Sequence, residues 1–256
     1  MATFKHISSK NADYGAAEQY LTFEHDEFTM KPTLDENGRL MLREDYRIAT
    51  LNCGDEDFAV ACMRSNLRYG KNQKREDVKS HHYIISFDPR DAVDNGLTVD
   101  RAQALGEEFC RKQFPGHQAI VCTHPDGHNH SGNIHVHIVI NSLRIAEVPF
   151  LPYMDRPADT RAGCKHRCTD AAMEYFKAEV MELCHRENLL VQTLAEILLV
   201  STMPSLRCPS VWRRQRPSWI TSISSRLPQR RKSESHSFMK KNCEAKMPVW
   251  WSWILC

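Results

Sequence analysis

The hydrophobic pattern of the first 191 residues alternates between strand-like and helix-like stretches. Residues 2–8 alternate weakly, and residues 81–87 (HHYIISF) form an apolar run that stops at Asp88-Pro89, so both stretches predict strands. Apolar residues at helical spacing predict helices over about 14–23, from Asp55 past Leu67, from Thr98 to Gln113 and from Ala171 to about Leu190.

Two further strands are predicted near the middle of the chain, over residues 117–123 and 134–141. Residues 24–54 are polar and contain turn-forming residues, which indicates a flap or an insertion. The resulting order is strand, helix, helix, strand, helix, strand, strand. This order predicts an α+β fold with a palm-like, mostly antiparallel sheet and helices packed on one face.

The segment from His124 to Asn141, which includes the loop between the last two predicted strands and the second of these strands itself, contains five of the thirteen histidines. Because side chains alternate along a strand, His135 and His137 share one face, and a long-looped hairpin would bring His124 beside them. Three neutral imidazoles with an open coordination position are typical of a catalytic metal. A pair of exposed histidines is the plainer interpretation of His-x-His alone, but the number of nearby histidines favours a metal site.

The loop of this hairpin offers rival ligands and a supporting carboxylate. His128 and His130 compete with His124 for the third place in the metal site. We expect Asp126 to support catalysis by accepting the spare N–H of a ligating histidine and thereby fixing its tautomer. By ligand softness, such a site would accept Mn, Zn, Co or Ni.

Composition adds a charge asymmetry. Residues 192–256 hold eleven Lys/Arg and three Glu without an Asp, so the acidic body contrasts with a basic tail. Phosphate binding would need clustered cations, and one cluster lies between Arg64 and Arg75. No apolar run is long enough for a membrane span or a signal peptide, which predicts a cytoplasmic protein without membrane insertion.

The segment His124-x-Asp126 … His135-Val-His137-Ile-Val-Ile-Asn141 resembles the three-histidine motif of relaxases, the HUH-type mobilisation nucleases of plasmids and conjugative transposons. Further similar stretches are residues 16–22, 82–87, 114–118 and 155–167, so the resemblance covers roughly residues 1–191. The loop after His124 is longer than in the compact form of the motif.

The resemblance implies a metal-dependent endonuclease that nicks one DNA strand at an origin of transfer through a 5′-phosphotyrosine intermediate. Tyr20 matches the catalytic tyrosine, with Tyr14 as the runner-up, and His124, His135 and His137 match the metal ligands. The implied metal is Mg²⁺ or Mn²⁺. The implied partners are single-stranded DNA at the origin, an accessory mobilisation protein and a coupling protein.

The character of the sequence changes at about residue 192. All five tryptophans lie in residues 192–256, and no hydrophobic period persists beyond Val200. We therefore predict a relaxase domain over 1–191 and an atypical basic tail that is truncated or frameshifted and disordered. A genuine DNA-binding tail with stacking aromatics is the competing interpretation.

Two other functions remain open from the sequence. A His₃ metallohydrolase would activate water at the same site and need no tyrosine. An inactive, DNA-binding remnant of a relaxase would keep the fold without the reaction.

Overall fold

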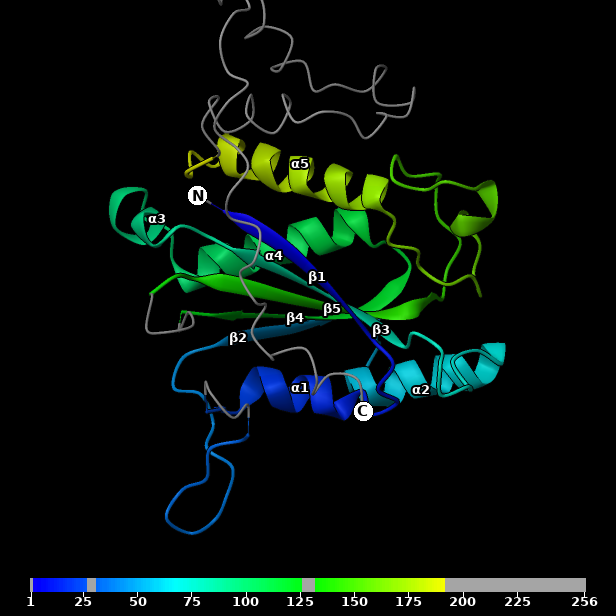
Figure 1. The fold of residues 1–256 in the computed structure, drawn as a ribbon, viewed down its shortest axis with the longest axis horizontal. Helices are drawn as coiled ribbons and strands as arrows, with labels where there is room; N and C mark the ends of the chain where they lie inside the picture. Colours follow the sequence, from blue (N-terminus) through cyan, green and yellow to red (C-terminus); the bar gives the residue numbers. More distant parts are fainter. Residues whose placement is uncertain (1, 27–30, 126–131, 192–256) are drawn as a thin grey trace, which may run out of the picture. The chain divides into compact units, whose positions relative to one another are not determined.

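The fold is built on one antiparallel sheet (Figure 1). The computed structural model describes residues 2–26, 31–125 and 132–191. Within these ranges, five strands lie in the order β1-β3-β5-β4-β2, and every neighbouring pair is antiparallel. The strands are β1 (Thr3–Ser9), β2 (Arg47–Leu51), β3 (Ser80–Ser86), β4 (His117–His124) and β5 (His135–Arg144). The predicted α+β class is confirmed.

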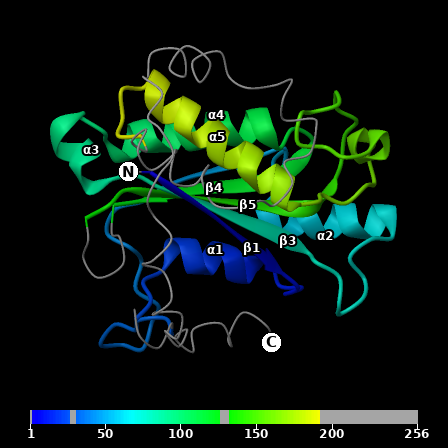
Figure 2. The same ribbon diagram turned by 45° about the horizontal axis from the view of Figure 1, so that its top comes forward.

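Helices cover both faces of the sheet, as Figures 1 and 2 show. One face carries α1 (Gly15–Thr22) and α2 (Phe58–Tyr69), and the other carries α4 (Val99–Gln113) and α5 (Asp170–Arg186). Shorter connecting elements are α3 (Pro89–Asp94) and the 3₁₀ turn η2 (Pro157–Thr160).

The expectation of helices on a single face was therefore wrong in that detail. The reason lies in β5, whose side chains are apolar in both directions. Val136, Ile138 and Ile140 belong to the core beneath α4 and α5, whereas Val139 packs in a second core with Ile120. A strand that is apolar on both faces must be covered on both.

Strand β2 lies inside the segment predicted to be only a flap. It pairs with β4, placing Ala49 opposite Val121. None of its five residues is fully buried, so the alternation that reveals a half-buried strand is weak. The remainder of the segment does fold back on itself, through isolated bridges such as Leu34 with Leu40.

A buried polar network fastens α1 and α2 to the end of β5. The Asn66 side-chain amide donates to the Tyr14 hydroxyl at 2.7 Å, and this hydroxyl donates to the Lys79 carbonyl at 3.0 Å. The Asn141 amide donates to Gln118 Oε1 at 3.0 Å. Burial raises the pKa of Tyr14, so it stays protonated and serves the structure here.

Three buried histidines, His81, His117 and His166, lie on the opposite side of the sheet, beneath α4 and α5. Burial, followed by the nearby charge of Arg144, lowers the pKa of His117 to about 3. Burial likewise lowers the pKa of His81 to about 3. These rings are therefore neutral in the folded protein at pH 7.

The described part of the chain ends at Val191, so the expectations about the tail, residues 192–256, lie outside it. In the described ranges, every helix is too short or too polar to cross a bilayer.

Stability should fall as the pH is lowered from 6.5 towards 3. In this window the unfolded chain takes up protons on its histidines while the folded rings resist them, so acid favours unfolding. His117→Asn removes one such group, and the slope of unfolding free energy against pH should decrease by up to about 1.4 kcal/mol per pH unit. Urea titrations between pH 7 and 4 measure this, with the exposed His185→Gln as control; equal slopes for His117→Asn and the parent would contradict it.

Candidate metal centre

Three histidines converge where β4 ends and β5 begins. The antiparallel register places His124 directly opposite His135, and His137 follows two residues later on the same face. One ring nitrogen from each of the three lies within 4.8 Å of the others. The structure thus brings together all three side chains that the sequence proposed as ligands.

The three imidazole rings are largely shielded from solvent. His124 is fully buried, His137 is 4% exposed and His135 is half-buried. Burial, followed by the charge of Arg43, lowers the pKa of His124 to about 3, and burial with the neighbouring His82 lowers that of His137 well below its usual range. Neutral imidazoles have the lone pairs that a metal needs.

The hydrogen bonds of two of these rings fix which nitrogen is left for a ligand. Nε2 of His124 donates to the Leu21 carbonyl at 2.8 Å, and Nδ1 of His135 lies 3.3 Å from the Asn133 carbonyl. A carbonyl only accepts, so the remaining nitrogens, His124 Nδ1 and His135 Nε2, carry lone pairs. These two nitrogens are 3.3 Å apart, and a shared cation would relieve their repulsion. The donor set therefore fits a divalent metal.

His82 of β3 supports the third ring. Its Nε2 lies 2.8 Å from Nδ1 of His137. For His137 to offer Nε2 to a metal, its Nδ1–H must donate to His82, which is the arrangement by which outer residues fix a ligand's tautomer. From the sequence, His82 was expected only to belong to a strand. Only the pairing of β3 with β5 brings its side chain to the face of the triad, so no local pattern marked it.

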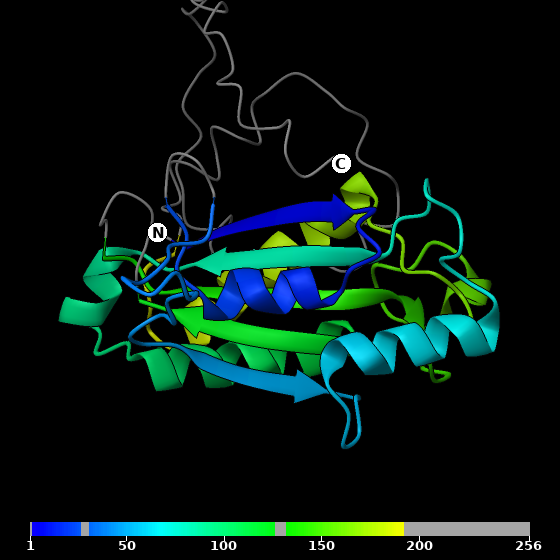
Figure 3. The same cartoon turned by 90° about the horizontal axis from the view of Figure 1, so that it is seen from below.

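Tyr20 lies at the edge of the cluster, on α1. Its half-buried ring stands edge-on to His137, with the ring centroids 6.1 Å apart, and lies 6.4 Å from His82. The bond from His124 to the carbonyl of Leu21 holds this end of α1 against β4. Figure 3, from the side of α1, shows this helix lying across the sheet.

Two more groups near the cluster were not found from the sequence. The ring of His25 lies 5.2 Å from that of Tyr20, and its Nδ1 is 3.0 Å from the Phe23 carbonyl. The charge of Arg43 helps to lower the pKa values of His25, His124 and His137. Both residues belong to the segment interpreted as a flap, where no pattern marked them.

The supporting carboxylate and the rival ligands cannot be placed. Asp126, His128 and His130 all lie outside the described residues. Tyr14, the runner-up for the nucleophile, is held in the buried network described above, where its ring packs against Phe58.

The fold and the site together define a class of protein: α+β domains in which three imidazoles converge beside a tyrosine. Residues 40–148 match the family described as Relaxase: MobA/VirD2-like, nuclease domain. The match spans less than half of the chain, and this part of it is similar to the MobA/VirD2-like relaxase nuclease domains, as the resemblance seen in the sequence implied.

One curated relative is similar to part of the chain. It is 30% identical over 144 residues to "Protein rlx" of Staphylococcus aureus, an alignment that spans 56% of this chain and 35% of that protein. The chain thus matches about a third of the length of this curated relative.

Two solved structures are also similar. One, titled "Molecular Basis of Vancomycin Resistance Transfer in Staphylococcus aureus", has a TM-score of 0.43 at 14% identity, covering 73% of this chain and 92% of that one. The other is the conjugative relaxase TrwC in complex with oriT DNA in a metal-bound structure, with a TM-score of 0.39 at 11% identity, covering 73% and 69%.

Addition of Mn²⁺ or Ni²⁺ should raise the thermal unfolding midpoint, because a ligand that binds only the folded state stabilises it. The increase should be lost in His135→Ala and His137→Ala. Differential scanning fluorimetry with and without EDTA measures this, and the exposed His185→Ala serves as the matched control. An equal metal-induced increase in His137→Ala would contradict the assignment of the ligands.

Proposed function

We propose that this domain is a metal-dependent DNA strand transferase that nicks one strand at an origin of transfer by forming a 5′-phosphotyrosine on Tyr20. The observation that carries the proposal is the position of Tyr20, edge-on to His137 at the margin of three converging imidazoles. The family match of residues 40–148 supports the same reaction class.

The chemistry requires a stronger nucleophile than a free phenol, whose pKa is about 10. A divalent cation held by His124, His135 and His137 would polarise the scissile phosphate and offset its developing charge. The Tyr20 oxygen bonds to phosphorus as the bond from phosphorus to the 3′ oxygen breaks. The proton lost by Tyr20 is balanced by the one gained at the released 3′-hydroxyl. The phosphotyrosine conserves a phosphoester bond for later rejoining.

His25 and Arg43 are suited to assist this step. With Nδ1–H of His25 donating to the Phe23 carbonyl, its Nε2 retains a lone pair that can accept the Tyr20 proton. Burial is the main cause that lowers the pKa of His25, so the ring is neutral at pH 7. The guanidinium of Arg43 adds positive charge near His124, where it would help to offset the charge of a bound phosphate.

The proposed substrate is single-stranded DNA at an origin of transfer, which is the substrate that the resemblance to relaxases implies. The neighbour TrwC was solved with oriT DNA and a bound metal. We retain Mg²⁺ or Mn²⁺ as the proposed metal, and an accessory mobilisation protein and a coupling protein as proposed partners.

The decisive assay incubates the protein with labelled single-stranded oligonucleotides tiled across the transfer origin of its element, with Mn²⁺ or Mg²⁺. A covalent protein–DNA adduct should form, should disappear with EDTA, and should map to Tyr20 by mass spectrometry. Tyr20→Phe should reduce adduct formation by at least about 10³-fold, because the nucleophile is removed.

Tyr14→Phe is the matched control. It should lower stability by about 1 kcal/mol or more, through the loss of buried hydrogen bonds, and leave the adduct intact. Cleavage without an adduct would favour the water-activating metallohydrolase instead. Metal binding without any cleavage, across the whole origin, would favour the inactive remnant.

His82→Ala should weaken metal affinity by about 10- to 100-fold, because His137 loses the acceptor that fixes its tautomer. Isothermal titration with Mn²⁺ measures this, with the exposed His185→Ala as the control. His82→Asn keeps a hydrogen-bonding group there and should recover part of the affinity. Unchanged affinity in His82→Ala would show that His82 does not position the ligand.

A further inference from the structure

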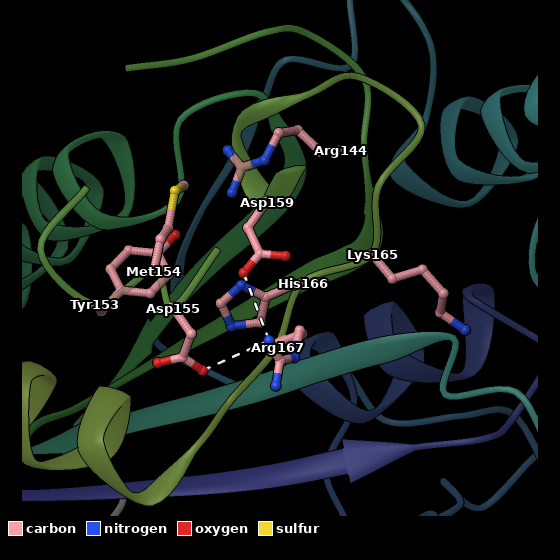
Figure 4. A pocket seen from close by; sticks show the side chains of 8 residues that line it. All are labelled: Arg144, Tyr153, Met154, Asp155, Asp159, Lys165, His166 and Arg167. Atoms are coloured by element: carbon pink, nitrogen blue, oxygen red, sulfur yellow. Dashed lines mark ion pairs between the residues drawn. The ribbon is translucent and has the colours of Figure 1, made fainter. Parts of the chain in front are cut away.

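A second polar site lies at the far end of β5, away from the histidine triad. Arg144 is the last residue of the strand that His135 begins, which places the two sites about 30 Å apart along it. The recess is open to solvent at its mouth, and its enclosed part has room for about one water-sized group (Figure 4). Its lining residues are Arg144, Tyr153, Met154, Asp155, Asp159, Lys165, His166 and Arg167.

The backbone holds this recess firmly. The chain before α5 returns alongside β5, where the Arg144 amide donates to the Cys164 carbonyl at 2.9 Å and the His166 amide donates to the Ser142 carbonyl at 2.6 Å. Lys165 forms an isolated bridge with Leu143. The side chains of Lys165, His166 and Arg167 are therefore presented from a segment that extends the sheet.

Arg144 is a buried cation without a carboxylate partner. Only 2% of the residue is exposed, and its guanidinium donates to the carbonyl of Pro115. It lies beside the Tyr153 hydroxyl, whose pKa it lowers against the stronger effect of burial. Among the described residues, no Asp or Glu side chain lies within ion-pair distance of Arg144. A buried charge of this kind is costly unless an anion balances it.

The other charges around the recess are already paired. Asp159 accepts from Arg156 at 3.0 Å and lies 3.7 Å from Arg167. Arg167 also lies 3.6 Å from Asp155, and Lys165 lies 3.5 Å from Asp77. Four cations thus face three carboxylates, and the unbalanced charge is that of Arg144.

His166 offers a second polar atom to a ligand at the recess. It is 7% exposed, and its Nε2 lies 2.7 Å from the Tyr83 hydroxyl, whereas its Nδ1 has no hydrogen-bond partner among the described residues. Figure 4 shows this ring in the middle of the recess, between Asp159 and Arg167. Buried polar atoms are nearly always hydrogen-bonded to protein, water or a ligand, so Nδ1 of His166 is available to a group at the recess.

We propose that the mouth of this recess binds a phosphate group between Arg144 and His166, with Lys165 adding positive charge at the rim. A tetrahedral oxyanion would accept hydrogen bonds from the guanidinium and from Nδ1–H of His166 while the Tyr83 hydroxyl donates to Nε2. The phosphate belongs either to a DNA backbone or to a free anion. The first source rests on the proposed function and would make the recess an anchor for the strand remote from the nicking site.

Inorganic phosphate is the first probe, followed through the imidazole nitrogens of His166 by two-dimensional ¹H–¹⁵N NMR. Phosphate should shift Nδ1 of His166 saturably, with a dissociation constant on the order of 1 mM or tighter. Arg144→Met should abolish the shift. If that variant does not fold, Lys165→Met, at a half-exposed position, should weaken binding several-fold. Arg111→Met, on the surface of α4, is the control and should leave binding unchanged.

A single-stranded oligothymidylate distinguishes the two sources. If it shifts Nδ1 of His166 and competes with phosphate, the phosphate is that of DNA, and Lys165→Met should reduce the salt dependence of DNA binding by about one phosphate contact. If phosphate alone shifts the resonance, the site takes a free anion. Absence of a shift with both probes, or an equal shift in Arg144→Met, overturns the proposal. This assay needs no nicking, so its failure is distinct from the failure of the adduct assay.

Discussion

The site depends on the two ring nitrogens of His124. One nitrogen donates to the carbonyl of Leu21 in α1, and the other faces His135 across the register of β4 and β5. The first bond fixes the end of the helix that carries Tyr20, and the second direction fixes where a cation can lie. A single buried side chain therefore sets the position of the proposed nucleophile relative to the proposed metal.

The surrounding structure makes this arrangement rigid and keeps it neutral. The two central strands are covered on both faces, so the rings at their ends lie in a medium that disfavours protonation. Neutral imidazoles, unlike protonated ones, carry no positive charge that would repel a cation, so they can bind a metal at pH 7. The same burial leaves His82 as the partner of His137, since water has little access to that nitrogen.

The parts of the site that lie close together in sequence were predictable. Alternation along one strand placed His135 and His137 on one face, and a hairpin added His124, because both effects depend on local backbone geometry. His82, His25 and Arg43 were missed because only tertiary packing brings them to the triad. For the fold, β2 was missed because its side chains are largely exposed. The helices on the second face depend on the pairing of β3 with β5, which no single segment of sequence reveals. The role of Tyr20 came from the resemblance and remains a proposal.

Anomalous diffraction from crystals soaked in Mn²⁺ would test the central claim most directly. We expect one strong anomalous peak, in bonding contact with His124 Nδ1, His135 Nε2 and His137 Nε2, on the side of the cluster that faces Tyr20. A peak bound through other residues, or no peak at this cluster under saturating Mn²⁺, would contradict it.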